Sequence, residues 1–337
     1  MNESAQELQA EIKTFQEDFR RMREEIGRVI VGQREIVDGV LSALIAGGHV
    51  LLEGVPGLGK TLLVRTLSDV LHAKFSRIQF TPDLMPADLI GTNVLIETPD
   101  GGREFRFDRG PLFGNIVLAD EINRATPKTQ SALLEAMQEH SITVAGVTYP
   151  LKGVFFVLAT QNPLEMEGTY PLPEAQLDRF LFKLLVEFPS SSEMASILDR
   201  TTETETPKAD RLFESRQILE MSKLARRIPI ADDVRQFAIR VVMSTHPKQD
   251  AAGPMVRQFV RYGSSPRGAQ AMILAAKINA ILDGRYHVAR DDIRAVAFMC
   301  LRHRVLLNFE GQAEAISTDA ILNDVLEHAS KKAVAAV

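Results

Sequence analysis

The sequence predicts an α/β domain with a central parallel sheet, followed by a small all-α domain. A glycine-rich loop separates a short apolar run from a helical pattern within residues 49–71. Two further runs, 115–119 and 154–158, are apolar throughout and are followed by polar residues, as buried parallel strands are. Such strong strand signals cease near residue 190, so we expect the α/β domain over residues 1–190 and the helical domain over residues 191–337.

The composition is that of an ordinary globular protein. The 337 residues include 39 Lys+Arg and 44 Asp+Glu, which gives a net charge of −5, and 45% of them are hydrophobic. This charge does not indicate a nucleic-acid-binding surface. No run approaches the length of a membrane span, and the N-terminus lacks a signal-peptide pattern. The single cysteine, Cys300, lies in an apolar run, so we expect it to be buried in a reduced, cytoplasmic protein.

Two helices precede the glycine-rich loop. Apolar residues spaced by three or four from Leu8 to Ile30 predict a long amphipathic helix. Its apolar stripe lacks the paired charges of a coiled coil, which favours packing on the body of the protein. After a turn at Val31-Gly32-Gln33, a second helix over residues 36–45 should end at Gly47-Gly48. The turn is placed to contact a nucleotide base, although a simple connector would look the same.

The loop reads Gly54-Val-Pro-Gly-Leu-Gly-Lys-Thr61 and matches G-x-x-x-x-G-K-[ST]. Such a loop turns backbone N–H groups toward phosphate oxygens at the positive end of the following helix. Lys60 would reach the outer phosphates, and the Thr61 hydroxyl would bind Mg²⁺. A plain glycine-rich turn is the alternative. The candidate nucleotide-binding residues here are Gly54, Pro56, Gly57, Leu58, Gly59, Lys60, Thr61 and Leu62.

A long insertion follows a short strand predicted over residues 76–80. Residues 81–114 are rich in proline and glycine and contain two strand patterns, 93–97 and 103–107, which predict a β-hairpin. An insertion of this length within a domain is usually functional, although a surface loop without a role remains open.

Polar residues follow the two buried strands. Asp120 and Glu121 come after the run at 115–119, at the strand end where ligands bind in open α/β sheets. Asp120 can hold Mg²⁺ through water, and Glu121 can act as general base on a water molecule; an ordinary helix cap is the alternative. Asn162 follows the run at 154–158 and could orient the same water, or could simply be a turn residue before proline.

The remaining elements are a hairpin and a set of helices. A helix should begin at Pro127, and residues 142–149 predict a hairpin that turns near Ala145-Gly146. A last strand is expected at 182–186. In the helical domain, Ser265 and Pro266 begin a helix whose first turn contains Arg267. A cation there opposes the helix dipole unless an anion such as phosphate compensates, although a surface arginine is also possible.

Taken together in chain order, these motifs resemble those of the AAA+ ATPases, and more closely those of the MoxR family. The likeness extends from about residue 28 to about residue 330. Besides the glycine-rich loop, it rests on Val31-Gly32-Gln33, Ile78-Gln79-Phe80-Thr81, Leu118-Ala-Asp-Glu-Ile-Asn-Arg-Ala125, Ala159-Thr-Gln-Asn-Pro163, Ala175-Gln-Leu-Asp-Arg-Phe180 and Ser265-Pro-Arg-Gly268.

The resemblance implies a P-loop NTPase (AAA+) three-layer domain with a helical lid. It also implies Walker A at the loop, Walker B at Asp120 and Glu121, sensor 1 at Asn162, sensor 2 at Arg267 and an arginine finger at Arg179. A finger acts on the neighbouring subunit's nucleotide, so the resemblance implies a ring, usually a hexamer. The family's helix-2 insert would lie within about 81–114 and its presensor hairpin at about 142–152.

The function implied is a chaperone-like ATPase that uses ATP and Mg²⁺ to remodel, activate or mature partner proteins. The family's usual partners contain von Willebrand factor A domains, and we expect neither nucleic-acid binding nor membrane insertion. The insert at 81–114 lacks an obvious aromatic-glycine pore loop, which argues against threading of whole polypeptides. Two alternatives remain: a chelatase-like motor for metal insertion, and a nucleotide-sensing scaffold with little turnover.

Overall fold

The computed structural model describes residues 3–55, 57–97, 99, 101–162, 169–202 and 207–331. Its centre is a five-stranded sheet with the strand order β2-β5-β8-β1-β9, in which every neighbouring pair is parallel. The sheet strands are β1 (Val50–Glu53), β2 (Phe75–Gln79), β5 (Ile116–Asp120), β8 (Phe156–Gln161) and β9 (Phe182–Leu185). This confirms the predicted parallel α/β fold, with strand ends displaced by one to three residues from the predicted ones.

Alternate residues of each strand pack into two separate cores. Leu52, Leu118 and Leu158 face one core, whereas Val117 and Val157 face the other. The first core lies against α1 (Glu3–Val29), α2 (Arg34–Ala46), α3 (Lys60–Val70) and the helical lid, and the second lies against α4 (Pro86–Ile90) and α5 (Pro127–Glu139). Because successive strand residues point to opposite faces, a run apolar throughout fills both cores, which produces the three layers.

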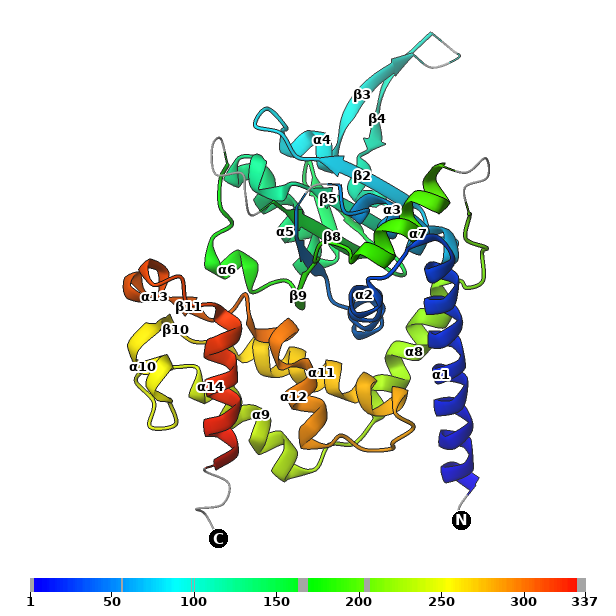
Figure 1. The fold of residues 1–337 in the computed structure, drawn as a ribbon. Helices are drawn as coiled ribbons and strands as arrows, with labels where there is room; N and C mark the ends of the chain where they lie inside the picture. Colours follow the sequence, from blue (N-terminus) through cyan, green and yellow to red (C-terminus); the bar gives the residue numbers. More distant parts are fainter. Residues whose placement is uncertain are drawn as a thin grey trace.

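The long N-terminal helix packs on the body of its own chain, as the sequence predicts. Its buried side chains include Phe15, Phe19 and Met22, and they belong to the core shared with α3 and the lid helices. Figure 1 shows α1 running along one side of the molecule beside α8. No helix within the described ranges is both long and apolar enough to cross a membrane.

Two hairpins extend from the α/β part. One is formed by β3 (Gly91–Glu97) and β4 (Arg103–Arg109), and the other by β6 (Ser141–Val144) and β7 (Val147–Pro150). Both predicted hairpins are therefore confirmed, and the second turns at Ala145 and Gly146, which both have positive φ. In Figure 1 the β3–β4 hairpin projects well beyond the sheet.

The chain after β9 is mainly helical, and most of its helices form the lid below the sheet in Figure 1. Its helices are α7 (Ser191–Thr202), α8 (Ser215–Arg227), α9 (Asp232–Ser244), α10 (Pro254–Phe259), α11 (Pro266–Leu282), α12 (Arg290–Leu301), α13 (Phe309–Ala313) and α14 (Thr318–Lys331). A short antiparallel pair, β10 (Val260–Tyr262) with β11 (Leu306–Leu307), lies among them. The short elements η1 (Pro111–Phe113), η2 (Ile122–Arg124) and α6 (Glu174–Leu177) complete the α/β part. Cys300 is fully buried, as predicted, and burial raises the pKa of its thiol to about 12.

Candidate functional site

The glycine-rich loop has the backbone geometry of a phosphate cradle. Gly57 and Gly59 adopt left-handed φ values of 85° and 76°, and a Cβ built on either meets nothing within 4 Å. Glycine is therefore needed for the turn, and open space lies beside the loop. Helix α3 begins at Lys60, directly after the loop, so its positive end faces that space. Pro56, also predicted to bind nucleotide, lies outside the described residues.

Lys60 folds back onto its own loop. Its Nζ donates to the carbonyl oxygens of Gly54 and Val55, at 2.5 and 3.3 Å. Burial lowers the pKa of the Lys60 ammonium, whereas the nearby carboxylates of Asp120 and Glu121 act in the opposite direction. The ammonium thus lies among acceptors that an anionic phosphate would replace.

A pocket of about 420 Å³ brings half of the predicted residues together. The loop and α3 contribute one wall, and the carboxyl ends of β2, β5 and β8 contribute the other, which is where ligands bind in open parallel sheets. The lining residues are Gly57, Gly59, Lys60, Thr61, Leu62, Arg77, Gln79, Asp120, Glu121, Thr160 and Asn162. Residues some sixty positions apart in sequence thus meet at one site, as the motif order predicts.

Thr160 connects the two adjacent acids. Its hydroxyl donates to Asp120 Oδ1 at 2.7 Å and accepts from the Glu121 backbone N–H at 2.8 Å. Glu121 has a left-handed φ of 56°, which turns the chain sharply at the end of β5. The second oxygen of Asp120 forms an ion pair with Arg77 at 2.8 Å. Both acids are therefore held in fixed places relative to the loop.

Two further side chains hold the Glu121 carboxylate. Oε2 of Glu121 accepts from Gln79 Nε2 at 2.9 Å and from Arg124 Nη1 at 3.1 Å. Sequence reasoning gave no role to Arg77, Gln79 or Thr160, although one signal was present. Arg77 and Gln79 are two residues apart on a strand, so they share a face at the end where the acids lie.

The oxygen ligands at the site fit Mg²⁺. The Thr61 hydroxyl and the Asp120 carboxylate line the same pocket, and Mg²⁺ in nucleotide sites usually takes only one or two protein oxygens besides water and phosphate. Among the described residues, no group of three or more His, Cys, Asp or Glu side chains forms a metal site. The pocket thus suits a metal that arrives with a phosphate ligand better than a metal held by protein alone.

The turn before α2 contacts the glycine-rich loop from behind. Gln33 Nε2 donates to the Leu58 carbonyl at 3.0 Å. Gly32 has a left-handed φ of 63°, which favours glycine, and the Glu193 side chain of α7 lies directly beside its Cα. Val31 and Gly32 line a separate cavity of about 390 Å³, whose walls come from α1, α2 and α7. The proposed base-contacting turn is therefore joined to the loop but does not line the pocket of the acids.

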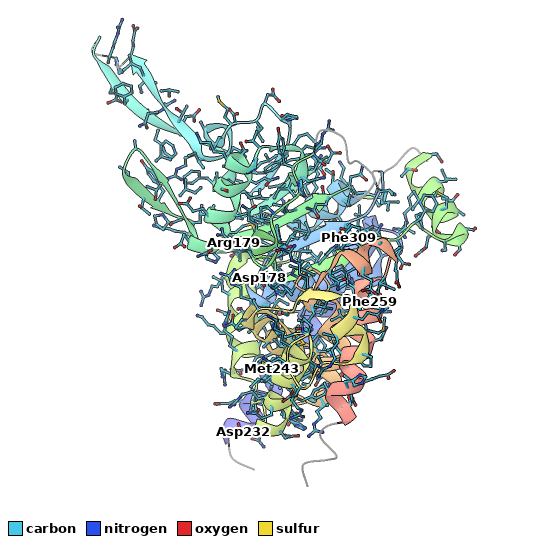
Figure 2. The ribbon with its side chains drawn as sticks, turned by 90° about the vertical axis from the view of Figure 1, so that its left-hand side faces the viewer. Asp178, Arg179, Asp232, Met243, Phe259 and Phe309 are labelled. Carbon is cyan, nitrogen blue, oxygen red and sulfur yellow. The ribbon has the colours of Figure 1, made fainter. Side chains whose placement is uncertain are left out.

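The two predicted arginines lie elsewhere. Neither Arg179 nor Arg267 lines the pocket of the acids. Figure 2 shows Asp178 and Arg179 where the α/β part meets the lid. Arg267 is 3.7 Å from the Asp178 carboxylate, which also accepts from the Ser265 hydroxyl at 2.9 Å. An internal carboxylate thus supplies the anion that the first turn of α11 requires.

Asp178 is held in turn by a buried arginine. Arg304 Nε donates to Asp178 Oδ1 at 2.8 Å, and its Nη2 donates to the carbonyl oxygens of Asp178 and Phe180 at 3.1 and 2.7 Å. The segment that carries Arg179 is therefore fastened on both sides of that residue to the lid.

Comparison with known proteins agrees with this geometry. The family described as "ATPase family associated with various cellular activities (AAA)" matches residues 49–182, and the AAA lid domain family matches residues 254–325. The chain is 42% identical to Chaperone MoxR1 of Mycobacterium tuberculosis, over 99% of this chain and 86% of the relative. It is 44% identical to YeaC of Bacillus subtilis, an uncharacterized protein, over 93% and 95% of the two chains.

A solved structure extends the likeness to three dimensions. The crystal structure of a proposed ATPase from Cytophaga hutchinsonii superposes with a TM-score of 0.89 and 38% sequence identity, covering 97% of this chain and 98% of that one. The chain belongs to the MoxR family of AAA+ ATPases.

Proposed function

We propose that this protein hydrolyses ATP with Mg²⁺ between the subunits of a ring and uses the cycle to remodel partner proteins. The observation that carries the proposal is the shared pocket. Lys60 and Thr61 of the loop line it together with Asp120, Glu121 and Asn162 from the sheet. Phosphate-binding groups and a general base at one site are what ATP hydrolysis requires.

Each residue of the pocket has a proposed role. The Lys60 ammonium exchanges the Gly54 and Val55 carbonyls for the outer phosphate oxygens. Thr61 and Asp120 would hold Mg²⁺, which when bound neutralises charge on the phosphate oxygens. Glu121 accepts the proton of the attacking water. Asn162, at the end of the neighbouring strand β8, orients that water.

Arg179 is proposed to act as an arginine finger on the nucleotide of the neighbouring subunit, and Arg267 is proposed to act as sensor 2 and stabilise charge on the transferring phosphoryl group. Neither lines the pocket of its own chain, and no hydrogen bond or ion pair to another described residue is recorded for the Arg179 guanidinium. An arginine supplied in trans is worth about a thousandfold or more in rate. A closed ring, proposed here to be a hexamer, gives every pocket such an arginine.

The name of the Mycobacterium tuberculosis relative, Chaperone MoxR1, supports a client protein as the target of the cycle. The two projecting hairpins offer a surface on which movement can be delivered. A partner with a von Willebrand factor A domain, in the cytoplasm, remains our proposal for the client. A chelatase-like motor for metal insertion has no separate observation in its favour.

A nucleotide-sensing scaffold is the second candidate, because two contacts restrain the catalytic groups. Lys60 donates to its own loop, and Gln79 and Arg124 hold the Glu121 carboxylate. A sensor could retain these contacts with ATP bound, whereas an ATPase must release them during turnover.

Substitution Glu121→Gln separates the two candidates. It keeps the size and hydrogen-bonding reach of the side chain but removes the basic oxygen, so we expect ATP binding to persist and turnover to fall by about a hundredfold or more. Binding is measured with a fluorescent ATP analogue and turnover by phosphate release. The matched control is Glu135→Gln on the exposed face of α5. Phosphate release at the wild-type rate in Glu121→Gln would show that Glu121 is not the base.

A further inference from the structure

A second pocket lies at the base of the two hairpins, on the opposite edge of the sheet from the nucleotide site. Its volume is about 440 Å³, and its walls come from the end of β4, from η1, from β7 and from the loop before β8. Asn115 and Phe155, which line it, directly precede β5 and β8. Asp120 and Gln161 end the same two strands at the nucleotide pocket, about 17 Å away by strand rise.

An aromatic cluster joins the two hairpins above this pocket. The ring of Phe107 on β4 stacks on Tyr149 of β7, with centroids 4.8 Å apart and an angle of 21° between the planes. Phe113 meets both rings edge-on, at 5.6 and 6.1 Å. Figure 2 shows both hairpins leaving the α/β part on the same side. The hairpins are therefore coupled, and Tyr149 and Phe113 give the pocket aromatic walls.

The charge of the pocket is entirely positive. Arg109 and Lys152 line it, and no aspartate or glutamate does. The Arg109 guanidinium lies 5.1 Å from the Phe113 ring centre, and neither cation has an ion pair with any residue in the described part of the chain. The amide of Asn115 is already used, because it accepts from Lys74 N and donates to the Val154 carbonyl. Within the described ranges, these two cations beside aromatic rings therefore have no internal anion.

An exposed apolar strip continues outward from the pocket. Leu95 and Phe105 face each other across the β3–β4 hairpin and are 53% and 75% exposed. Phe105 lies on the same face of β4 as Phe107 and Arg109, because alternate strand residues share a face. A ligand held by the cations would place its next residues along this strip.

We propose that this pocket binds an acidic segment of a partner protein, with a carboxylate between Arg109 and Lys152 and an adjacent apolar side chain against the aromatic rings. A nucleic acid fits the surface less well. On the face of the hairpin that carries Phe105 and Phe107, Glu97 lies opposite Arg103 at the far end, so a chain of phosphates running along the strip would meet a carboxylate. A single carboxylate in the pocket meets none.

The position of the pocket connects partner binding with the nucleotide site. Asn115 and Phe155 of its wall lead directly into β5 and β8. The acids Asp120 and Glu121 lie at the other end of β5, and Asn162 directly follows β8. That the bound segment belongs to a protein remodelled by ATP rests on the proposed function. Binding of an acidic segment to this pocket does not rest on the proposed function, and it is measured without nucleotide.

The test uses the full chain and two tripeptides, acetyl-Asp-Trp-Leu-amide and its neutral counterpart acetyl-Asn-Trp-Leu-amide. The chain has no tryptophan, so the fluorescence of the peptide reports binding without background. We expect the acidic peptide to bind about five- to tenfold more tightly than the neutral one, because charge-assisted hydrogen bonds are the stronger kind. Arg109→Gln and Lys152→Gln should each reduce this preference.

Arg106→Gln is the matched control, because Arg106 lies on the other face of the same strand and outside the pocket. It should leave the preference unchanged, and so should Lys60→Ala, which removes a nucleotide contact. Equal affinity for the two peptides, or equal loss in the Arg106 control, would overturn the proposal. Tighter binding of the trinucleotide dT₃, lost in Arg109→Gln, would assign the pocket to nucleic acid instead.

Discussion

At the scale of single residues, the site depends on two adjacent acids that are held differently. Asp120 ends β5 and receives the Thr160 hydroxyl and the Arg77 guanidinium. Glu121 leaves the strand direction through its left-handed φ and is held by Gln79 and Arg124 instead. Under the proposed mechanism, Asp120 is thus held where Mg²⁺ would bind, whereas Glu121 would act as base only when its contacts loosen.

The contact from Gln79 should therefore restrain turnover. In Gln79→Ala the Glu121 carboxylate loses one of its two side-chain donors, so we expect the basal ATP turnover number to rise about two- to fivefold, since a partly exposed hydrogen bond contributes roughly 0.5–1 kcal/mol. Steady-state phosphate release at saturating ATP measures it. Gln138→Ala, at an exposed position of α5, serves as control. A fall in the turnover number would mean that Gln79 orients Glu121 productively.

Sequence reasoning recovered part of this site because motif residues have fixed spacing. The loop and the acids follow strands directly, so their meeting at one sheet edge follows from parallel topology. Thr160 was missed because one polar residue at the end of an apolar run carries no pattern of its own. On the sequence alone, phosphate was the candidate anion beside Arg267. In the structure the carboxylate of Asp178, which is distant in sequence, lies there.

At the scale of elements, strand β1 begins beside a buried histidine. The His49 ring joins neighbouring elements, since Nδ1 accepts from Val157 N–H and Nε2 donates to the Met137 carbonyl on α5. The bond at Nδ1 requires the neutral ring, because protonation would place a hydrogen on Nδ1. Burial lowers the pKa of His49 to about 4, and the proximity of His140 acts in the same direction. Protonation of His49 would therefore break its bond to Val157 and loosen the contact with β8.

This histidine should make stability depend on pH. The unfolded chain binds a proton at His49 below about pH 6.5, whereas the folded chain does so only near pH 4, so the free energy of unfolding decreases as pH falls between these values. The decrease amounts to about 3 kcal/mol for this residue. Urea unfolding of the wild type at several pH values measures it.

His49→Gln isolates this contribution, because the glutamine amide can still donate toward Met137 but does not titrate. The variant should show a smaller loss of stability between pH 6.5 and pH 4 than the wild type. Some loss should remain, since burial also holds the pKa of His303 well below its usual value. An unchanged pH dependence would show that His49 has the same protonation state in the folded and the unfolded chain over this pH range.

Elements were predicted best where their pattern is long. Helix α1 and the two hairpins could be recognised because many of their residues repeat one pattern. The strand expected within the run 154–163 was observed at Phe156–Gln161, where polar Thr160 and Gln161 continue the ladder beside β1. Short α4 and the β10–β11 pair are decided by tertiary contacts, which no local pattern encodes.

At the scale of the whole molecule, the fold separates three surfaces around one sheet. The nucleotide pocket lies at the carboxyl edge and the hairpin pocket at the opposite edge, while Arg179 lies where the α/β part meets the lid. Arg304 ties the segment that carries Arg179 to the lid, so movement of the lid must move this arginine. In the proposed ring, a neighbouring subunit would therefore sense the state of the lid through Arg179.

Mixed rings test this arrangement. Arg179→Ala subunits keep an intact pocket but lack the arginine, whereas Lys60→Ala subunits lack the phosphate contact but keep the arginine. Each variant alone should be nearly inactive, and a mixture should recover activity only if the arginine acts across a head-to-tail interface. In an equal mixture about one interface in four combines both intact halves, so we expect at most about a quarter of wild-type turnover.

A second mixture controls for this result. Glu121→Gln and Lys60→Ala both damage the pocket and both keep Arg179, so no interface between them contains an intact pocket. This mixture should recover nothing, although its subunits assemble in the same way. Native mass spectrometry establishes that each mixture contains rings of both variants. If such rings form and the Arg179→Ala mixture stays inactive at every ratio, Arg179 acts within its own chain or not at all.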